Sequence, residues 1–217
     1  MFSSINNDTF DNILYQNMTS IITGDIINSK KSTPKNWLEA LKNTLNSFGK
    51  TPHTWEVYRG DSFQLEVHPE QALQACMLIK TTIKQFEHLD VRLAIGIGEK
   101  TYQSKNITES NGSAFVNSGE CFENLKKTTL AIKSPFNSFD TALNIMLELA
   151  QLTINNWSST SAILVKTTLE NPNLNQNQLA KIFNKTQGNV SQGLKRAGFD
   201  EISKLLDYYK TQTQSLC

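Results

Sequence analysis

Hydrophobic residues recur along the first two thirds of the chain with two spacings, and each spacing predicts one type of element. Apolar residues three or four apart predict amphipathic helices. Two such faces are Trp37, Leu41, Leu45 and Phe48, and then Ala72, Cys76, Ile79, Ile83 and Phe86. Short alternating or continuous apolar runs predict strands at residues 20–25, 55–57, 63–67, 91–97 and 130–132. Residues 113–126 are expected to form a further helix.

The order of these elements, β-α-β-β-α-β-α-β, predicts the fold class. Helices that connect strands cross over a sheet, so the order implies an α/β fold with a mixed sheet of the ferredoxin-like or palm type. Gly60-Asp61 lies between the second and third strands, and Gly-Asp is a recognised two-residue hairpin turn.

The rest of the chain has only helical patterns, which predicts a second domain. A helix at residues 138–155 bridges to a C-terminal part that is all helix from Trp157 onward. We therefore expect a palm domain at residues 18–150 and a helical domain at residues 151–217. Residues 1–17 are polar and rich in Asn, and they are expected to form a loose extension.

The helical part contains the spacing of a helix-turn-helix. Asn171-Pro172 ends a first helix at residues 161–170, because the residue before proline avoids the helical conformation. Asn175 is a candidate cap for a second helix that runs to Phe183. Asn184 tolerates the left-handed conformation of a tight turn. Val190 and Leu194 then anchor a third helix, which completes the DNA-binding pattern.

The third helix is expected to present a polar face that contains no acid. Its candidate DNA-binding residues are Gln187, Asn189, Ser191, Gln192, Lys195 and Arg196. Gln and Asn can bind base edges, and Lys and Arg can neutralise phosphates. Residues 171–217 contain six Lys or Arg and three acids, a modest excess, so a homodimer paired through residues 199–209 is expected. The alternative is a helical module that packs on the palm or binds protein.

Two aspartates of the palm form a candidate magnesium site. Asp25 ends the first strand and Asp61 lies at the hairpin tip, so both carboxylates are expected at one edge of the sheet. Two close carboxylates repel unless a cation lies between them, and Mg²⁺ prefers such oxygen ligands. The carbonyl of Ile26 is a further candidate ligand, and Arg59 can contact a phosphate. In the alternative, each aspartate only makes a turn. Gly112, before the next helix, is a candidate phosphate contact.

Composition limits the possible function classes. The 217 residues carry a net charge of +1, so any contact with DNA requires a local patch. Cys76, Cys121 and Cys217 are scattered, which argues against a disulfide framework or a zinc site and favours a reduced, cytoplasmic compartment. No apolar run approaches membrane-spanning length, and the N-terminus does not have the pattern of a signal peptide.

Several palm positions resemble, in order, the landmarks of class III nucleotide cyclases and GGDEF-like palms: Asp25-Ile26, Gly60-Asp61, the strand at 92–97 and Val116-Asn117. The resemblance implies that Asp25 and Asp61 hold metal ions, that Gly60 belongs to the nucleotide site and that Asn117 stabilises a transition state. Cys121 stands where the family has a second stabilising residue, an arginine, and Val57 where it has a purine-selecting lysine. These departures imply phosphate binding without efficient cyclisation.

The whole chain resembles the SatD family of bacterial proteins over residues 18–210. The stretches that carry the resemblance are SIITGDIINS, YRGDSFQLEV, RLAIGIGE, ITESNGSAFVNSGE and NVSQGLKRA. It implies a bacterial, cytosolic protein with a DNA-binding end, and it implies nothing about catalysis.

The sequence therefore predicts a transcription regulator whose palm binds a nucleotide or phosphate ligand and changes the DNA affinity of paired helix-turn-helix modules. Two alternatives remain. The first is a metal-dependent, nucleotide-processing enzyme with a regulatory helical tail. The second is a structural module in which both sites are vestigial.

Overall fold

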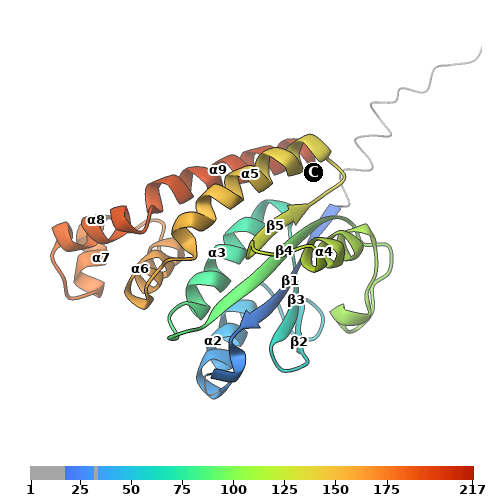
Figure 1. Cartoon of the computed structure of the whole chain (residues 1–217), viewed down its shortest axis with the longest axis horizontal. Coiled ribbons are helices and arrows are strands. Elements are labelled where there is room, and N and C mark those ends of the chain that lie inside the picture. Colours follow the sequence, from blue (N-terminus) through green and yellow to red (C-terminus); the bar gives the residue numbers. More distant parts are fainter. Residues whose placement is uncertain (1–17, 32–33) are drawn as a thin grey trace, which may run out of the picture.

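The computed structural model describes residues 18–31 and 34–217 and contains a mixed five-stranded sheet (Figure 1). The predicted extension at residues 1–17 lies outside the described residues. The strands are β1 (Met18–Ile27), β2 (Trp55–Tyr58), β3 (Ser62–Val67), β4 (Asp90–Glu99) and β5 (Leu130–Lys133). Their order in the sheet is β2-β3-β1-β4-β5. Only β4 and β5 pair in parallel, and the other neighbours are antiparallel.

Helices cover both faces of this sheet, and the fold is α/β as predicted. The longer helices are α2 (Pro34–Asn46), α3 (Ala72–Ile83), α4 (Ser113–Glu123), α5 (Asn137–Ile154), α6 (Ser159–Glu170), α7 (Gln176–Ile182), α8 (Gln187–Arg196) and α9 (Phe199–Leu216). Short 3-10 helices are η1 (Ser29–Lys31), η2 (Pro69–Gln71) and η3 (Ile107–Glu109). None of the helices in the described ranges combines the length and the apolarity that crossing a bilayer requires.

Alternation along β1 sends successive side chains to opposite faces of the sheet. Ile22 and Ile26 lie in the main core with α2 and α3. Thr23 points the other way and hydrogen-bonds Ser118 of α4 (2.7 Å between hydroxyl oxygens). Gly96 of β4 lets α4 approach the sheet, because a Cβ at this position would lie 2.1 Å from the backbone nitrogen of Ser118.

The exposed edge of β5 is closed by two amide side chains of α5. The Asn144 amide donates to the carbonyl of Ile132 and accepts from its N–H, at 2.9 Å each. Gln151 makes the same pair of bonds with Leu130, at 2.9 and 3.0 Å. The two amides therefore bond the edge of β5 in the way that a sixth strand would. An edge bonded in this way is not free to pair with another chain, which is how unpaired edges cause aggregation.

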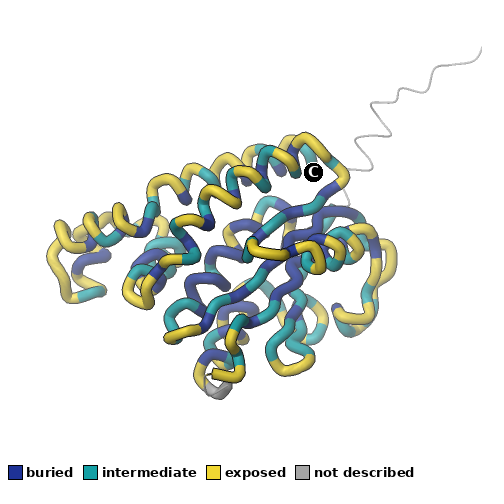
Figure 2. The backbone as a smooth tube through the Cα atoms, in the orientation of Figure 1, coloured by how far each residue is buried: buried dark blue, intermediate teal, exposed yellow. Residues whose placement is uncertain are grey.

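The main core continues beyond the predicted domain boundary at residue 150, which falls inside α5. Val165 of α6 and Tyr209 of α9 belong to the same buried cluster as the sheet. The Tyr209 hydroxyl donates to the carbonyl of Pro69 (2.8 Å), and the Trp157 indole donates to the carbonyl of Ala197 (2.9 Å). Only the end of the helical part has a core of its own, between α6, α7 and α8. Figure 2 shows that α7 and α8 are mostly exposed at this end of the molecule.

A buried lysine joins the sheet to the start of the helical part. The Lys80 ammonium, only 3% exposed, lies 2.7 Å from an Asp90 carboxylate oxygen and donates to Thr129 and Asn155 (2.9 Å each). Burial lowers the pKa of Lys80, and the nearby Asp90 carboxylate opposes this shift.

We expect Lys80→Ala to lower the free energy of unfolding by about 3 kcal/mol, because it leaves buried acceptors without their cation. Chemical denaturation measures this effect. Lys42→Ala, at an exposed position of α2, is the control and is expected to change stability by less than about 0.5 kcal/mol. Equal effects of the two substitutions would contradict a stabilising role for the Lys80 contacts.

Candidate functional site

One candidate site is a row of polar side chains across four strands. Strand register places Tyr58 of β2 opposite Ser62 of β3, Ser62 opposite Asp25 of β1, and Asp25 opposite Arg92 of β4. Directly opposed residues point to the same face, so all four lie on the α4 side of the sheet. Burial raises the pKa of Tyr58, and the Asp25 carboxylate adds to this increase while Arg59 opposes it.

Each oxygen of the Asp25 carboxylate accepts a hydrogen bond from a protein group. Ser62 donates to one of its oxygens (3.1 Å), and Arg92 donates to the other (3.0 Å). The guanidinium of Arg92 also lies over the ring of Phe122, 5.1 Å from its centroid. Arg92 was not among the predicted site residues, because its place opposite Asp25 depends on the pairing of two strands far apart in sequence.

The hairpin brings Asp61 to the end of β1, as predicted. The carbonyl of Asp61 accepts from the Ile26 N–H (3.1 Å), and its carboxylate accepts from the Ser29 hydroxyl (2.6 Å). Arg59 and Gly60 adopt positive φ angles of 53° and 91° in the turn, and both are exposed.

A Mg²⁺ ion at Asp25 stays a prediction, and it would have to share that carboxylate with protein groups. The Arg92 guanidinium pairs with Asp25, so a metal ion would approach a carboxylate that already has a cationic partner. Within residues 18–31 and 34–217, no group of three or more His, Cys, Asp and Glu side chains is arranged to hold a metal.

The other predicted nucleotide-binding residues lie at the opposite end of the sheet. Gly112 precedes α4 and lies next to the end of β4. A Cβ added at this position would clash with the carbonyl oxygen of Glu99. The Asn117 amide donates to the carbonyl of Ile97 (2.8 Å) and thus fastens α4 to β4. Ile97 is five residues from Arg92, or roughly 17 Å along a strand at about 3.3 Å per residue. The structure therefore separates Gly112 and Asn117 from Arg59, Gly60 and Asp61 within one chain. Cys121 is buried, which raises its pKa to about 12 and keeps the thiol protonated.

The second candidate site is formed by α7, a tight turn and α8. Asn175 caps α7 in a reciprocal box with Gln178, with bonds of 2.9 and 3.0 Å. Asn184 adopts the predicted left-handed conformation, with φ 50°, and the N–H of Lys185 then reaches back to the carbonyl of Ala180 (2.9 Å). Thr186 begins α8 by accepting from the N–H of Asn189 (3.2 Å).

The inner side of α8 is anchored as predicted. Val190 and Leu194 are 1% and 6% exposed, and they pack with Leu164 of α6 and with Leu179 and Ala180 of α7. Gln187 lies on this same side at the exposed start of α8, and the other polar residues of α8 lie on its remaining sides.

The six candidate DNA-binding residues of α8 together form what we call the α8 face. Five of the six are exposed and Ser191 is half-buried; the exposed ones are Gln187, Asn189, Gln192, Lys195 and Arg196. Asn189 and Arg196 also line a groove against α6. No acid occurs between Asn171 and Phe199, and the charged residues of this stretch are Lys181, Lys185, Lys195 and Arg196.

The first residues of α7 and α8 are joined by a side-chain hydrogen bond that was not predicted. The Gln187 amide nitrogen donates to the carbonyl oxygen of Gln176, at 2.6 Å. Both residues are exposed, so the bond restrains a side chain that would otherwise move freely in solvent. The sequence signal was a pair of glutamines at the starts of two consecutive helices.

Comparison with known proteins assigns no family to the chain. Models of known protein families do not match the chain, and a search of curated proteins also finds no match.

Proposed function

We propose that the chain is a DNA-binding regulator in which α7, the turn and α8 form a helix-turn-helix. The turn geometry, the left-handed Asn184 and the buried anchors of α8 support this proposal. In such units the second helix enters the major groove and its N-terminal residues contact base edges. Here that helix is α8, and its N-terminal residues are Gln187 and Asn189.

The single observation that carries the proposal is the α8 face. It combines amide side chains near the start of the helix with Lys195 and Arg196 in its last turn. Amides suit base edges and cations suit phosphates, so the two halves match the two kinds of DNA contact. The 29 residues from Asn171 to Phe199 contain no Asp or Glu. An exposed surface that binds nothing commonly carries acids as well as bases, so this absence favours an anionic partner.

The bond between Gln176 and Gln187 explains how the face can select a base. Gln187 uses one of its two amide hydrogens in this bond. Its other hydrogen and its carbonyl oxygen can then bind N7 and the N6 amino group of one adenine. Because the side chain is already oriented, less conformational entropy is lost when it binds.

The affinity is expected to depend strongly on salt. Four cations lie in and around α7 and α8, so one copy neutralises at most four phosphates. The logarithm of the binding constant should then fall with the logarithm of salt concentration with a slope of roughly −3 to −4 per copy.

Selection from a pool of random DNA duplexes at low salt tests the proposal. We expect the chain to enrich a defined sequence and Gln187→Ala to lose preference at one adenine by roughly 5- to 100-fold. Gln176→Ala should relax the same position to a smaller extent, because Gln187 remains but is no longer oriented.

Gln103→Ala is the matched control, since Gln103 is an exposed glutamine that contacts His53 far from α8. It should enrich the same sequence as the unmodified chain. Failure of the unmodified chain to enrich any sequence, or unchanged preference in Gln187→Ala, would contradict the proposal.

We propose no nucleotide chemistry for the sheet end, because Asp25 is neutralised by Arg92 and Asn117 lies at the opposite end of the sheet. Binding of a phosphate ligand by the palm stays a prediction. Thermal unfolding with and without nucleoside triphosphates and Mg²⁺ tests it.

A further inference from the structure

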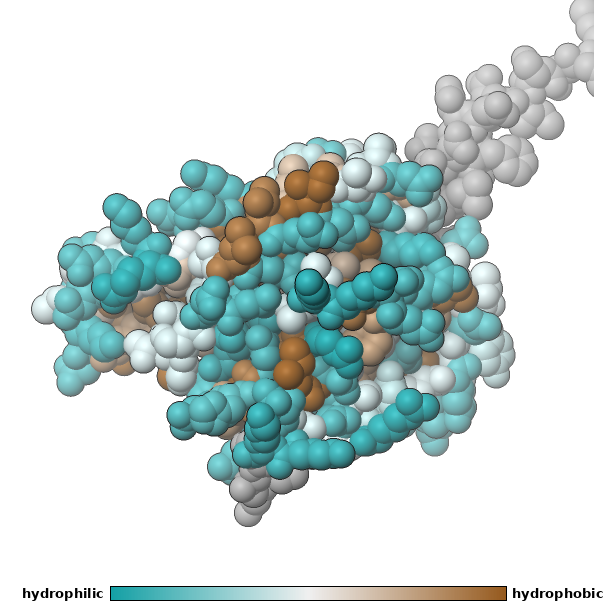
Figure 3. All heavy atoms as spheres, in the orientation of Figure 1, coloured by the Kyte–Doolittle hydropathy of each residue, from teal (hydrophilic) through white to brown (hydrophobic). Residues whose placement is uncertain are grey.

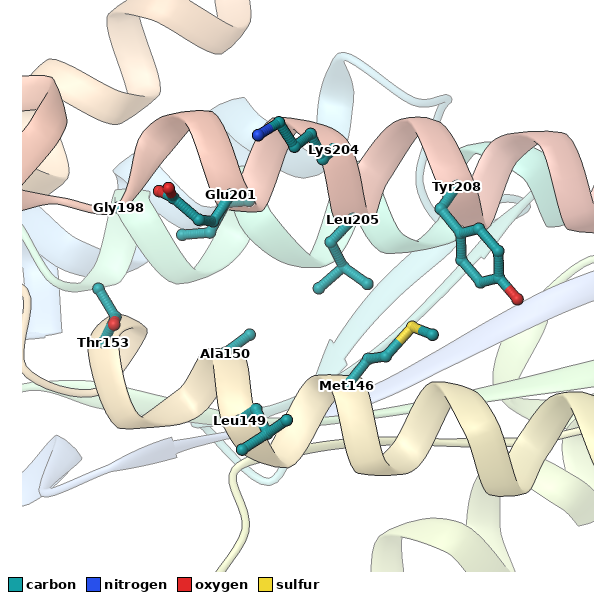
Figure 4. Close-up of a pocket in the computed structure, with 10 residues that line it drawn as sticks. Met146, Leu149, Ala150, Thr153, Gly198, Glu201, Lys204, Leu205 and Tyr208 are labelled. Carbon is teal, nitrogen blue, oxygen red and sulfur yellow. The ribbon is translucent and has the colours of Figure 1, made fainter.

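Helices α5 and α9 lie side by side and antiparallel, and together they form an exposed surface that we call the α5–α9 face (Figure 1). A groove of about 530 Å³ runs between them. Figure 4 shows Met146, Ala150 and Thr153 of α5 facing Leu205 and Tyr208 of α9 across this groove. Its lining is therefore mainly apolar.

A ridge of large apolar side chains stands beside the groove on α5. Ile145, Leu149 and Leu152 are 56%, 63% and 72% exposed. Their spacing of four and three residues places them on one line along the helix. Figure 3 shows the apolar band that follows this part of the molecule. Contiguous apolar surface of this kind marks an interaction site.

We propose that the α5–α9 face binds a second copy of the chain. A ridge next to a parallel groove is complementary to itself. Rotation by 180° about an axis parallel to the two helices lays the ridge of each copy into the groove of the other. The same residues are then buried twice, as in an isologous interface.

Two charged residues, Glu148 and Lys204, make this rotation testable. A Cβ added at Gly198 would lie 3.1 Å from the side chain of Thr153. Gly198 and Thr153 are therefore at the same height along the two antiparallel helices. Glu148 is five residues before Thr153, about 7.5 Å along α5, and Lys204 is six residues after Gly198, about 9 Å along α9. The two exposed residues are thus nearly level. Glu148 lies on the outer side of the ridge, where it also borders a hollow beside α4, and Lys204 lines the groove together with Glu201. The rotation therefore brings Glu148 of one copy toward Lys204 of the other, with Glu201 nearby.

The area of the face is sufficient for a stable pair. Each helix has 18 residues and is therefore about 27 Å long at about 1.5 Å per residue. With axes about 10 Å apart, the two helices cover a strip of roughly 540 Å². The accessible area of an uneven surface exceeds its footprint, so the face reaches the ~600 Å² per partner at the lower end of stable interfaces.

The direction of the axis has a consequence for DNA, which rests on the proposed function. An axis along the helices keeps α5 of both copies parallel, so both α8 faces lie at the same end of the dimer. If α5 of one copy were antiparallel to α5 of the other, the two α8 faces would lie at opposite ends of the dimer. Two α8 helices at one end can contact two half-sites of the same duplex.

Analytical ultracentrifugation of the full chain tests the dimer without DNA. We expect a dimer whose dissociation constant rises at least ~100-fold in Leu149→Glu, because the charge would enter the apolar groove. Val116→Glu is the control, since Val116 is a 51% exposed apolar residue of α4. A monomer up to about 100 µM, or equal effects of the two substitutions, would overturn the proposal.

Charge reversal tests the orientation of the two copies. Glu148→Lys and Lys204→Glu should each weaken the dimer roughly tenfold, because each pair occurs twice. The double variant should return to within about threefold of the original dissociation constant, since the pairs are restored with opposite sign. A double variant weaker than both single variants would exclude this orientation.

DNA binding is measured on the same proteins, so the two proposals can fail separately. A dimer that enriches no DNA sequence contradicts the proposed function and leaves the α5–α9 face intact. A monomer that binds a defined sequence contradicts the dimer and leaves the helix-turn-helix intact.

Discussion

The double substitution Lys195→Glu/Arg196→Glu should reduce DNA binding at least ~100-fold at about 100 mM salt. Both side chains are exposed in the last turn of α8, where the proposed complex places phosphates. Reversal removes two favourable contacts and adds two repulsions with the backbone. A fluorescence anisotropy titration over a range of salt concentrations measures the change, and the magnitude of the salt slope should fall by about two per copy.

Lys126→Glu/Lys127→Glu is the matched control for this experiment. These two exposed, adjacent lysines lie in the loop between α4 and β5, and their reversal changes the net charge by the same amount. We expect less than about threefold loss of affinity, because this loop is not part of the α8 face. Similar losses in the two variants would show that overall charge, and not the α8 face, governs binding.

Gly96→Ala should lower the free energy of unfolding by about 3 kcal/mol. The added Cβ would lie 2.1 Å from the backbone nitrogen of Ser118 and 2.3 Å from the carbonyl oxygen of Ala114. Both atoms belong to the backbone of α4, so the helix would have to move away from the sheet. That movement would also strain the bonds from Thr23 and Asn117 that join α4 to the sheet. Chemical denaturation followed by circular dichroism measures the loss.

Gly119→Ala in α4 has the opposite expected sign. A Cβ built on Gly119 meets no atom within 4 Å. Alanine has a higher helix propensity than glycine, so the substitution should raise stability by about 0.5–1 kcal/mol. If both substitutions destabilised the chain equally, close packing of α4 on Gly96 would not be the cause.

The geometry of α7 and α8 could be predicted from sequence because it depends on local interactions. The Asn175 cap, the left-handed Asn184 and the buried Val190 and Leu194 are fixed by neighbours within a few positions. The element order of the sheet was predictable for the same reason, since hydrophobic spacing within each segment determines its type. The ends of the elements differ: α3 ends at Ile83, before the predicted Phe86, and β1 continues past Asp25 to Ile27. The hairpin between β2 and β3 also has three loop residues, 59–61, where the sequence predicted a two-residue turn.

The arrangement of the sheet-end residues could not be predicted, because it depends on strand register. Asp25 and Arg92 are 67 residues apart in the chain and meet only because β1 and β4 pair antiparallel in one register. A shift by one residue would turn every side chain to the other face. Asn117 was expected near Asp25, but the direction in which α4 crosses the sheet places it at the far end of β4.

The sequence patterns also did not predict that the sheet and the C-terminal helices share one continuous core. The amphipathic pattern of residues 199–209 predicted a helix with one buried side, and we expected that side to be buried against a second copy of the chain. In the structure Ile202 and Tyr209 pack into the main core, while Leu205 and Tyr208 line the groove of the α5–α9 face. Periodicity identifies an apolar side of a helix but does not identify its partner.

The packing of α9 against the sheet layer determines the order in which the protein can fold during synthesis. Tyr209, 1% exposed, packs at a buried site beside the ring of Phe139 on α5, and its hydroxyl bonds the carbonyl of Pro69 across 140 positions. A nascent chain that has not yet passed Tyr209 leaves this site open and its apolar walls in contact with water. The α/β layer therefore reaches its final stability only after the ribosome has delivered α9, and until then the chain is exposed to chaperones and proteases.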